Sequence, residues 1–304
     1  MTRTATPAKR ATLARWTGRK HVARVVDMTA PRSDGSIVVA TNGHLALLKP
    51  GGRLVVFAPS YRASRTLEPY ITLARGCFGR DVVYALRLTS NRGITRIGAG
   101  GSVSKFARLP GSGLLNGIAY DGTGHFGHRL LATSSASGVT TVFAIDCHGA
   151  VKVLTRRAPR VEGGVAVAPA SFGAYGGDLI APDEVAGKLY AIAPTGNATL
   201  ILSSPVPHGQ DVGIESEGFV PAQYSTALVS DRLTPGNPHP GDDLILGLGR
   251  AALSGAGVTA GQLLIVNEGG TDTIAVSCAS SCHAREVATG PHEAHTEGHV
   301  VFRR

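Results

Sequence analysis

The segment Thr141 to Leu154, TVFAIDCHGAVKVL, decides the fold because its pattern recurs along the chain at a nearly fixed interval. Each copy reads as an apolar strand, a short turn and a second strand. Aligned Leu48, Ile97, Ile145 and Ile192 give steps of 49, 48 and 47 residues. A period in this range, with several strands per unit, is typical of a β-propeller. The other copies are Leu45 to Phe57 (LALLKPGGRLVVF), Gly93 to Phe106 (GITRIGAGGSVSKF) and Lys188 to Leu202 (KLYAIAPTGNATLIL).

The composition agrees with an all-β protein. Forty Gly and 17 Pro in 304 residues suit many tight turns and few helices. About 282 residues follow the first 22, and dividing them by a period of 47 gives six units. We therefore predict a single propeller domain over residues 21–304 with six blades, and seven blades as the alternative.

Three units can be traced strand by strand from the centre outward. Past Pro205 the register is irregular, and a Pro-rich loop at residues 234–240 (TPGNPHP) reads as an insertion. A propeller must join its ends or expose sheet edges, so we expect the C-terminal strand at 299–302 to complete the blade begun by residues 36–59. The predicted strands are 69–74, 81–88, 93–99 and 102–109; 117–120, 129–134, 140–146 and 150–155; and 164–168, 178–183, 188–193 and 197–202.

The positive charge is concentrated at the N-terminus. The net charge is +9, and residues 1–26 contribute seven Lys or Arg and no acid, which leaves +2 for the rest. No aromatic stacking ladder or recognition motif accompanies these cations, so we predict no nucleic-acid partner. Residues 1–20 are interpreted as a basic, flexible tail, with a membrane-surface arm or a targeting peptide as alternatives.

The chain lacks an 18-residue apolar run and lacks an apolar signal core in residues 1–30. We therefore expect no membrane span and, by default, a cytoplasmic monomer. Cys278 and Cys282 follow the predicted strand 273–277 and either close a hairpin disulfide or remain free thiols. A disulfide there would favour an oxidising, secreted location. A zinc site is disfavoured because no second ligand pair accompanies them.

A polar residue followed by a small residue and an apolar run recurs at the starts of the inner strands. Because inner strands surround the axis of a propeller, equivalent positions should converge there. Several carboxylates in a narrow channel repel one another unless protons, water or a cation offsets them, and Ca²⁺ is the natural cation for oxygen ligands. A water-filled tunnel is the alternative. The predicted ring comprises Glu68, Asn116, Glu162, Glu217 and Glu297.

Candidates for activating water lie in the run PHGQDVGIESEG. His208, Asp211 and Glu215 are the predicted catalytic groups, because a carboxylate or histidine of tuned pKa can accept a proton from water. A surface role for His208 is the alternative. A second cluster, His292, His295 and His299, alternates along a predicted strand, so the three side chains should not share one metal.

Asn116-Gly117-Ile118-Ala119 and the blade plan resemble the six-bladed calcium-dependent propellers that include gluconolactonases, senescence marker protein and strictosidine synthase. In the lactonases of that superfamily a Glu, two Asn and an Asp on inner strands hold the metal. The resemblance implies that Glu68 or Glu297 supplies the Glu and Asn116 one Asn. This chain has Glu162 and Glu217, or Glu215, where the second Asn and the Asp would stand.

Two functions from different classes remain. One is a calcium-dependent enzyme of the lactonase or esterase type that acts on a small ester or lactone. The other is a non-catalytic propeller that presents loops to a protein or a carbohydrate. The sequence contains no nucleophile elbow, phosphate loop, dinucleotide fingerprint or zinc protease motif, which disfavours serine hydrolysis and nucleotide chemistry.

Overall fold

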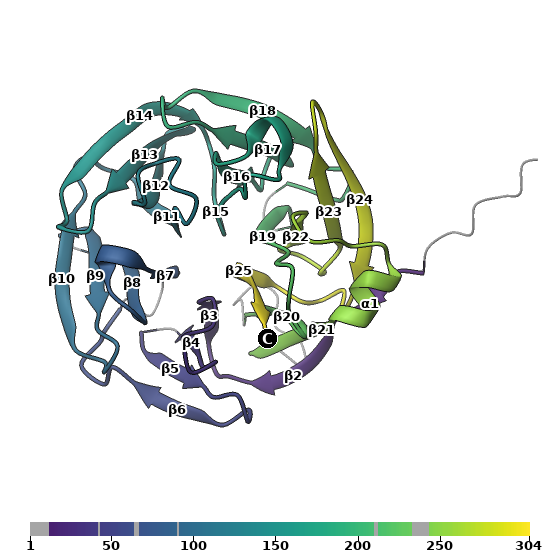
Figure 1. Cartoon of the computed structure of the whole chain (residues 1–304), viewed down its shortest axis with the longest axis horizontal. Coiled ribbons are helices and arrows are strands. Elements are labelled where there is room, and N and C mark those ends of the chain that lie inside the picture. The colour runs from purple at the N-terminus through teal and green to yellow at the C-terminus, as the bar shows by residue number, and fades with distance from the viewer. Residues whose placement is uncertain (1–11, 42, 64–66, 90, 210–211, 233–242) are drawn as a thin grey trace, which may run out of the picture.

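The computed structural model describes residues 12–41, 43–63, 67–89, 91–209, 212–232 and 243–304. Its sheets stand side by side in a ring around a common axis (Figure 1), which confirms an all-β, propeller-like fold. Four sheets have four strands each. They are β3 (Val25–Met28), β4 (Ile37–Thr41), β5 (Leu45–Leu48) and β6 (Leu54–Phe57); β7 (Ile71–Ala74), β8 (Val82–Arg87), β9 (Gly93–Ile97) and β10 (Val103–Arg108); β11 (Leu114–Tyr120), β12 (Leu130–Ala136), β13 (Val139–Ile145) and β14 (Val151–Pro159); and β15 (Ala166–Val167), β16 (Leu179–Asp183), β17 (Lys188–Ile192) and β18 (Ala198–Ser203).

The repeat seen in the sequence corresponds to the third and fourth strands of these sheets. Leu48, Ile97, Ile145 and Ile192 are the last residues of β5, β9, β13 and β17, and all four are buried. Each third strand turns back into an antiparallel fourth strand whose outer side chains are more exposed. Most residues of the inner strands are buried, and these include polar side chains such as Asp27 of β3 and Glu217 of β19.

The remaining strands form one nine-stranded sheet with the order β1-β24-β23-β22-β19-β25-β20-β21-β2. Its chain path is not consecutive, because β20 and β21 lie between β19 and β22 in the sequence but on the far side of β25 in the sheet. A short helix, α1 (Arg250–Gly255), connects β21 to β22. Hydrogen bonding thus defines five sheets, and the count of six blades stays a prediction. The strands are β1 (Ala14–Arg15), β2 (Thr17–His21), β19 (Ile214–Phe219), β20 (Thr226–Asp231), β21 (Leu244–Gly249), β22 (Leu263–Asn267), β23 (Thr273–Cys278), β24 (Cys282–Thr289) and β25 (Thr296–Arg303).

The C-terminal strand does join the ring, but not at the predicted place. β25 pairs antiparallel with β20 and meets β19 in parallel, whereas the sheet of residues 37–57 takes β3 as its innermost strand. The predicted tail boundary at residue 20 is also wrong for its last part, because β1 pairs with β24 and β2 with β21. Residues 1–11 and the Pro-rich loop at 234–240 lie outside the described residues.

The inner strands all run in the same direction along the axis. The last residues of β3, β7, β11, β15, β19 and β25 line one cavity, so these strands end at one mouth of the ring, here called the carboxyl-end mouth. The opposite end, where they begin, is called the amino-end mouth. Bulges interrupt β11 between Leu115 and Gly117 and β19 between Ile214 and Ser216. Such bulges commonly redirect side chains beside functional sites.

Two disulfides cross-link the chain. The Cys278–Cys282 bridge closes the β23–β24 hairpin, which settles the alternative left open by the sequence in favour of the disulfide. A second bridge, Cys77–Cys147, joins the 3₁₀ turn η1 (Gly76–Phe78) to the turn after β13. Another 3₁₀ turn, η2 (Gly173–Tyr175), precedes β16. Among the described residues, no helix has the length and apolar character needed to cross a membrane.

Candidate functional site

A cluster of buried carboxylates lies on the axis at the amino-end mouth. Glu215 on β19 and Glu297 on β25 come from neighbouring inner strands and are fully or almost fully buried. The hydroxyl of Tyr70, one residue before β7, lies 2.5 Å from Oε1 of Glu215 and 2.7 Å from Oε2 of Glu297. Polar residues at the starts of three inner strands thus lie together.

Three more members follow the second strands of their sheets. Glu184 comes directly after β16, Arg232 after β20 and Glu268 after β22. A second strand runs antiparallel to the inner strand, so its end reaches the same mouth at which the inner strand begins. Backbone hydrogen bonds fix two of them against β25, from Arg232 N–H to the His295 carbonyl and from Thr296 N–H to the Glu268 carbonyl.

Two cationic side chains face the carboxylates. Nε2 of His295 lies 2.6 Å from Oε1 of Glu268 and 3.6 Å from Oε1 of Glu297. The Arg232 guanidinium donates to Glu297 at 2.7 Å and also pairs with Glu68. Burial lowers the pKa of His295, but the hydrogen bonds and charges of Glu268 and Glu297 outweigh it and raise this pKa to about 10. His295 is therefore an imidazolium at neutral pH.

The carboxylates differ in their protonation because their surroundings differ. Burial and then the charge of Glu297 raise the pKa of Glu215 well above its usual range. The charge of Glu297, followed by burial, raises the pKa of Glu68 to about 7. Burial alone would raise the pKa of Glu297, but His295 and Arg232 overcome it and lower this pKa to about 2. The cluster therefore holds both neutral and ionised carboxyl groups at neutral pH.

The donor atoms of this cluster are close enough to share a cation. One ligand oxygen each from Glu184, Glu215 and Glu268 lies within 4.8 Å of the others, and the same limit holds for one carboxylate oxygen each from Glu268 and Glu297 and a ring nitrogen of His295. Oε2 of Glu268 is buried and makes no hydrogen bond with a described residue. Three carboxylates without sulfur ligands match the preference of Ca²⁺ for oxygen. The donor set of this mouth therefore fits a hard divalent cation.

Only part of the predicted ring converges. Glu68 and Glu297 join the cluster, whereas Asn116 donates to the Val161 carbonyl at 2.6 Å and accepts from Thr133 at 3.0 Å. Glu162 pairs instead with Arg160 at 2.6 Å, and its oxygens are not among those that converge. Glu217 is fully buried and lines the cavity at the carboxyl-end mouth.

The predicted catalytic residues also separate. Glu215 is a central member of the cluster. His208 is exposed; its Nδ1 lies 3.3 Å from the Val206 carbonyl, and its ring covers Gly187. Asp211 lies outside the described residues.

Sequence reasoning did not identify Tyr70, Arg232 or Glu268 as members of this site. A usable signal exists: Glu184, Arg232 and Glu268 all occupy the first position after a second strand. In a propeller that position faces the amino-end mouth, so it can supply site residues just as the start of the inner strand does. His295 was grouped with His292 and His299, but His295 binds Glu268 whereas His299 binds Asp27.

The fold is shared with several solved structures. A streptogramin B lyase structure superposes with a TM-score of 0.52 at 10% identity, covering 92% of this chain and 75% of that chain. A chain of a nidogen/laminin complex gives a TM-score of 0.56 at 11% identity, covering 92% of this chain and 85% of that one. At such identities the likeness establishes the fold alone.

A gluconolactonase from Xanthomonas campestris is also among the similar structures, with a TM-score of 0.46, 14% identity and coverage of 72% of this chain and 70% of that chain. This is the kind of protein that the sequence resembles, and the structural likeness is too low to carry an argument about activity. No protein-family model matches the chain, and no curated protein matches it significantly. By its fold and its site geometry, this protein is a propeller with an acidic cluster on its axis.

Proposed function

We propose that this protein is a metal-dependent propeller enzyme of the lactone or ester hydrolase type, with its cation site at the amino-end mouth. The observation that carries the proposal is the approach of the Glu184, Glu215 and Glu268 oxygens to within 4.8 Å of one another in a buried setting. Ca²⁺ bound there would polarise the carbonyl of an ester or lactone. The sequence-derived ligand set is thereby revised, with Asn116, Glu162 and Glu217 removed.

The chain itself supplies a group for accepting a proton from water. Glu68 is the most accessible carboxylate of the cluster, with 30% of its side chain exposed. Its pKa of about 7 lets it accept a proton near neutral pH, which is where a general base works best. Arg232 contacts both Glu68 and Glu297 and can orient the base or bind developing negative charge. Glu215, fully buried, serves better as a ligand than as the base.

The proposal includes six blades as its architecture. In the nine-stranded sheet the run β19-β22-β23-β24 and the run β25-β20-β21-β2 each repeat the four-strand plan, and only one bridge, Glu217 to His299, joins the two inner strands. Two blades that meet at this bridge account for the sheet. They would place six inner strands around the axis.

The first test is metal content together with thermal unfolding before and after chelation. We expect one calcium per chain and a clear fall in melting temperature with EDTA, because a ligand that binds only the folded state stabilises it. Glu215→Gln should abolish calcium binding, and Glu162→Gln is the matched control because that carboxylate pairs with Arg160 and is not one of the three whose oxygens converge.

Activity is the second test. Hydrolysis of a panel of γ- and δ-lactones and p-nitrophenyl esters should require calcium and should be lost in Glu215→Gln but retained in Glu162→Gln. A calcium-binding protein inactive on the whole panel would contradict the hydrolase and retain the cation site. A metal-free protein whose melting temperature is unchanged by EDTA would overturn both the hydrolase and the cation site, and would favour a non-catalytic binding propeller.

A further inference from the structure

A cavity of about 890 Å³ opens at the carboxyl-end mouth, on the other side of the ring from the acidic cluster. Its walls come from the ends of all six inner strands, including Met28 of β3, Leu73 of β7 and Tyr120 of β11. Volumes of this order are typical of sites for small organic ligands. The cavity therefore has the size and position of a second binding site.

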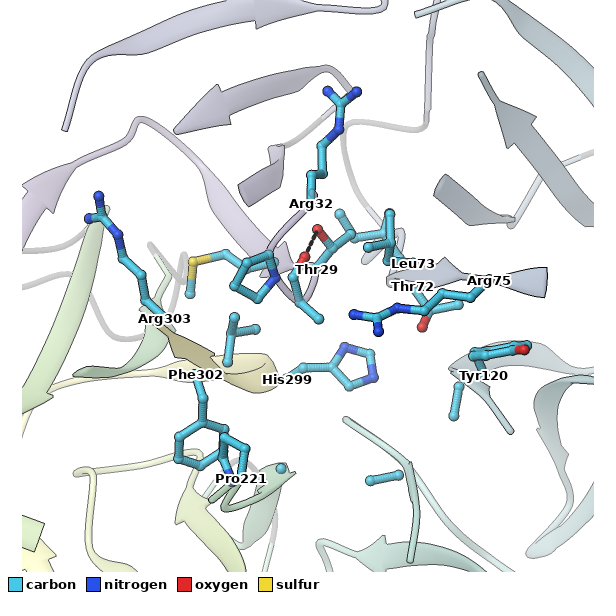
Figure 2. A pocket seen from close by; sticks show the side chains of 18 of the residues that line it. Thr29, Arg32, Thr72, Leu73, Arg75, Tyr120, Pro221, His299, Phe302 and Arg303 are labelled. Atoms are coloured by element: carbon cyan, nitrogen blue, oxygen red, sulfur yellow. Dashed lines mark hydrogen bonds between the residues drawn. The ribbon is translucent and has the colours of Figure 1, made fainter. Parts of the chain in front are cut away.

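The wall of this cavity is strongly basic. Three of its arginines already have partners, because Arg32 donates to the Ala99 carbonyl, Arg303 donates to that of Pro50, and Arg80 lies 4.0 Å from Asp81, which also lines the cavity. The side chain of Arg75 forms neither a hydrogen bond nor an ion pair within the described part of the chain, and Figure 2 shows its guanidinium extending toward His299. Its planar donor set suits a carboxylate or phosphate. The cationic or ionisable basic residues of the lining are Arg32, Arg75, Arg80, Arg303, Arg304 and His299.

His299 is held as a fixed cation on the cavity floor. Its Nδ1 lies 3.0 Å from both carboxylate oxygens of Asp27, and its Nε2 lies 3.1 Å from the Ile118 carbonyl. Since both partners only accept, both ring nitrogens must carry protons. Gly298, with φ +73°, makes this arrangement possible, because a Cβ there would lie 2.3 Å from Oδ1 of Asp27. Asp27 balances much of the charge, so Arg75 remains the main anion-binding group.

Glu217 is the unusual group of the floor. It is fully buried, it lines the cavity, and neither carboxylate oxygen makes an ordinary hydrogen bond with a described residue. Such a buried carboxyl group lacks the hydrogen bonds that buried polar groups normally make. A ligand in the cavity can supply them.

We propose that this cavity binds small hydroxylated organic anions, with the anionic group at Arg75 and a hydroxyl group hydrogen-bonded to Glu217. The site is separate from the proposed cation site. Glu217 and Glu215 are two residues apart on β19, and Glu217 lines the cavity at the carboxyl-end mouth whereas Glu215 belongs to the acidic cluster at the amino-end mouth. Hydroxycarboxylates and sugar phosphates both have the required chemistry, and the experiment distinguishes them.

Isothermal titration of EDTA-treated protein tests the pairing of charge and hydroxyl. Tartrate should bind, and succinate, a dicarboxylate of the same chain length without hydroxyls, should bind about tenfold more weakly or worse. Glucose 6-phosphate is the sugar phosphate probe, with glucose and inorganic phosphate as its controls. Tighter binding of tartrate identifies the hydroxycarboxylate class, and tighter binding of glucose 6-phosphate the sugar phosphate class. Equal affinity for tartrate and succinate, or heats from neither tartrate nor glucose 6-phosphate, would overturn the proposal.

Variants assign the two contacts. Arg75→Gln should lower the affinity for the probe about tenfold or more. Arg53→Gln, which replaces an exposed arginine outside the cavity lining, should leave the affinity unchanged. Glu217→Gln keeps a hydrogen-bonding group of the same size and should retain the preference for tartrate over succinate. Glu217→Leu should lose that preference. Unchanged binding in Arg75→Gln would refute the site even if a Glu217 variant fails to fold.

The same titration separates this proposal from the proposed function. Glu215→Gln should lose calcium binding yet retain tartrate binding, since Arg75 and Glu217 remain. Loss of anion binding with intact calcium binding in Arg75→Gln would complete the separation.

Discussion

The Tyr70 hydroxyl lies 2.5 Å from Oε1 of Glu215 and so joins the start of one inner strand to another. The same hydroxyl lies 2.7 Å from Oε2 of Glu297. A phenol has a single proton, so it can donate to only one of the two carboxyl groups. Glu297 has a lowered pKa and Glu215 a raised one. Tyr70 therefore donates a hydrogen bond to Glu297 and accepts one from the carboxyl group of Glu215. Without a cation, Glu215 is therefore a carboxylic acid.

Tyr70→Phe tests this bridge. Removal of the hydroxyl takes one hydrogen bond from each of two buried carboxyl groups, although Glu297 keeps Arg232 and His295, and it should lower the free energy of unfolding by about 1–3 kcal/mol in a urea titration. The control is Tyr61→Phe, since Tyr61 is equally buried but its hydroxyl makes no hydrogen bond with a described residue. That variant should be neutral or slightly stabilised. Equal losses in both variants would contradict the bridge.

Calcium binding should release protons. The cation needs Glu215 as a carboxylate, so binding must displace the proton that the raised pKa of this group retains. Affinity should therefore rise with pH, and the binding enthalpy at one pH should differ between PIPES and Tris by the ionisation heats of the buffers. A binding enthalpy independent of buffer would show that Glu215 is already ionised.

The metal-free protein should lose stability as the pH rises from about 4.5 to about 7. In the unfolded chain Glu68 ionises near 4.5, whereas in the folded chain its pKa is about 7. Between these values the unfolded state has released the proton and the folded state still binds it, so a rise in pH favours unfolding. Glu68→Gln should reduce this slope in urea titrations with EDTA. Glu286→Gln, at an exposed position of β24, should leave the slope as in the wild type.

The two disulfides should differ in their contribution to stability. Chain-entropy estimates give about 4 kcal/mol for a loop of the Cys77–Cys147 length and about 2 kcal/mol for one of the Cys278–Cys282 length; the sequence separations are 70 and 4 residues. Cys77→Ser with Cys147→Ser should thus lower the melting temperature more than Cys278→Ser with Cys282→Ser. The reverse order would contradict the estimate. Both bridges favour an oxidising compartment as the protein's working location.

The hairpins, which local sequence determines, were predictable. The pairing of β20 and β21 beside β25 was not. The hairpins ending at Ile97, Ile145 and Ile192 are close in sequence and punctuated by Gly, so their pattern is visible. Nothing in the residues of β20 and β21 indicates that they cross over to pair beside β25, because side-chain alternation specifies a face and not a partner sheet.

The sequence predicted which strands carry the site residues, but a β-bulge changed which residue of the strand reaches the site. The motif Glu217-Gly218 resembles Asn116-Gly117, yet the bulges of β11 and β19 make Glu215 the residue equivalent to Asn116, as each is the extra residue of its bulge. A slip of two residues keeps the side chain on the same face and moves it about 6.6 Å along the strand. That distance separates the acidic cluster, which contains Glu215, from the cavity that Glu217 lines.

Deletion of residues 296–304 should abolish folding and not merely shorten the chain. β25 hydrogen-bonds to β20 and meets β19, so its loss would leave two inner edges unpaired and expose the surroundings of Val300 and Val301, which are 4% and 3% exposed. It would also remove Glu297, the partner of His295 and Arg232, from the cluster. Circular dichroism should show no cooperative thermal transition, whereas a chain that lacks only Arg304 should melt like the wild type. A truncated protein with an unchanged melting temperature would refute closure of the ring by β25.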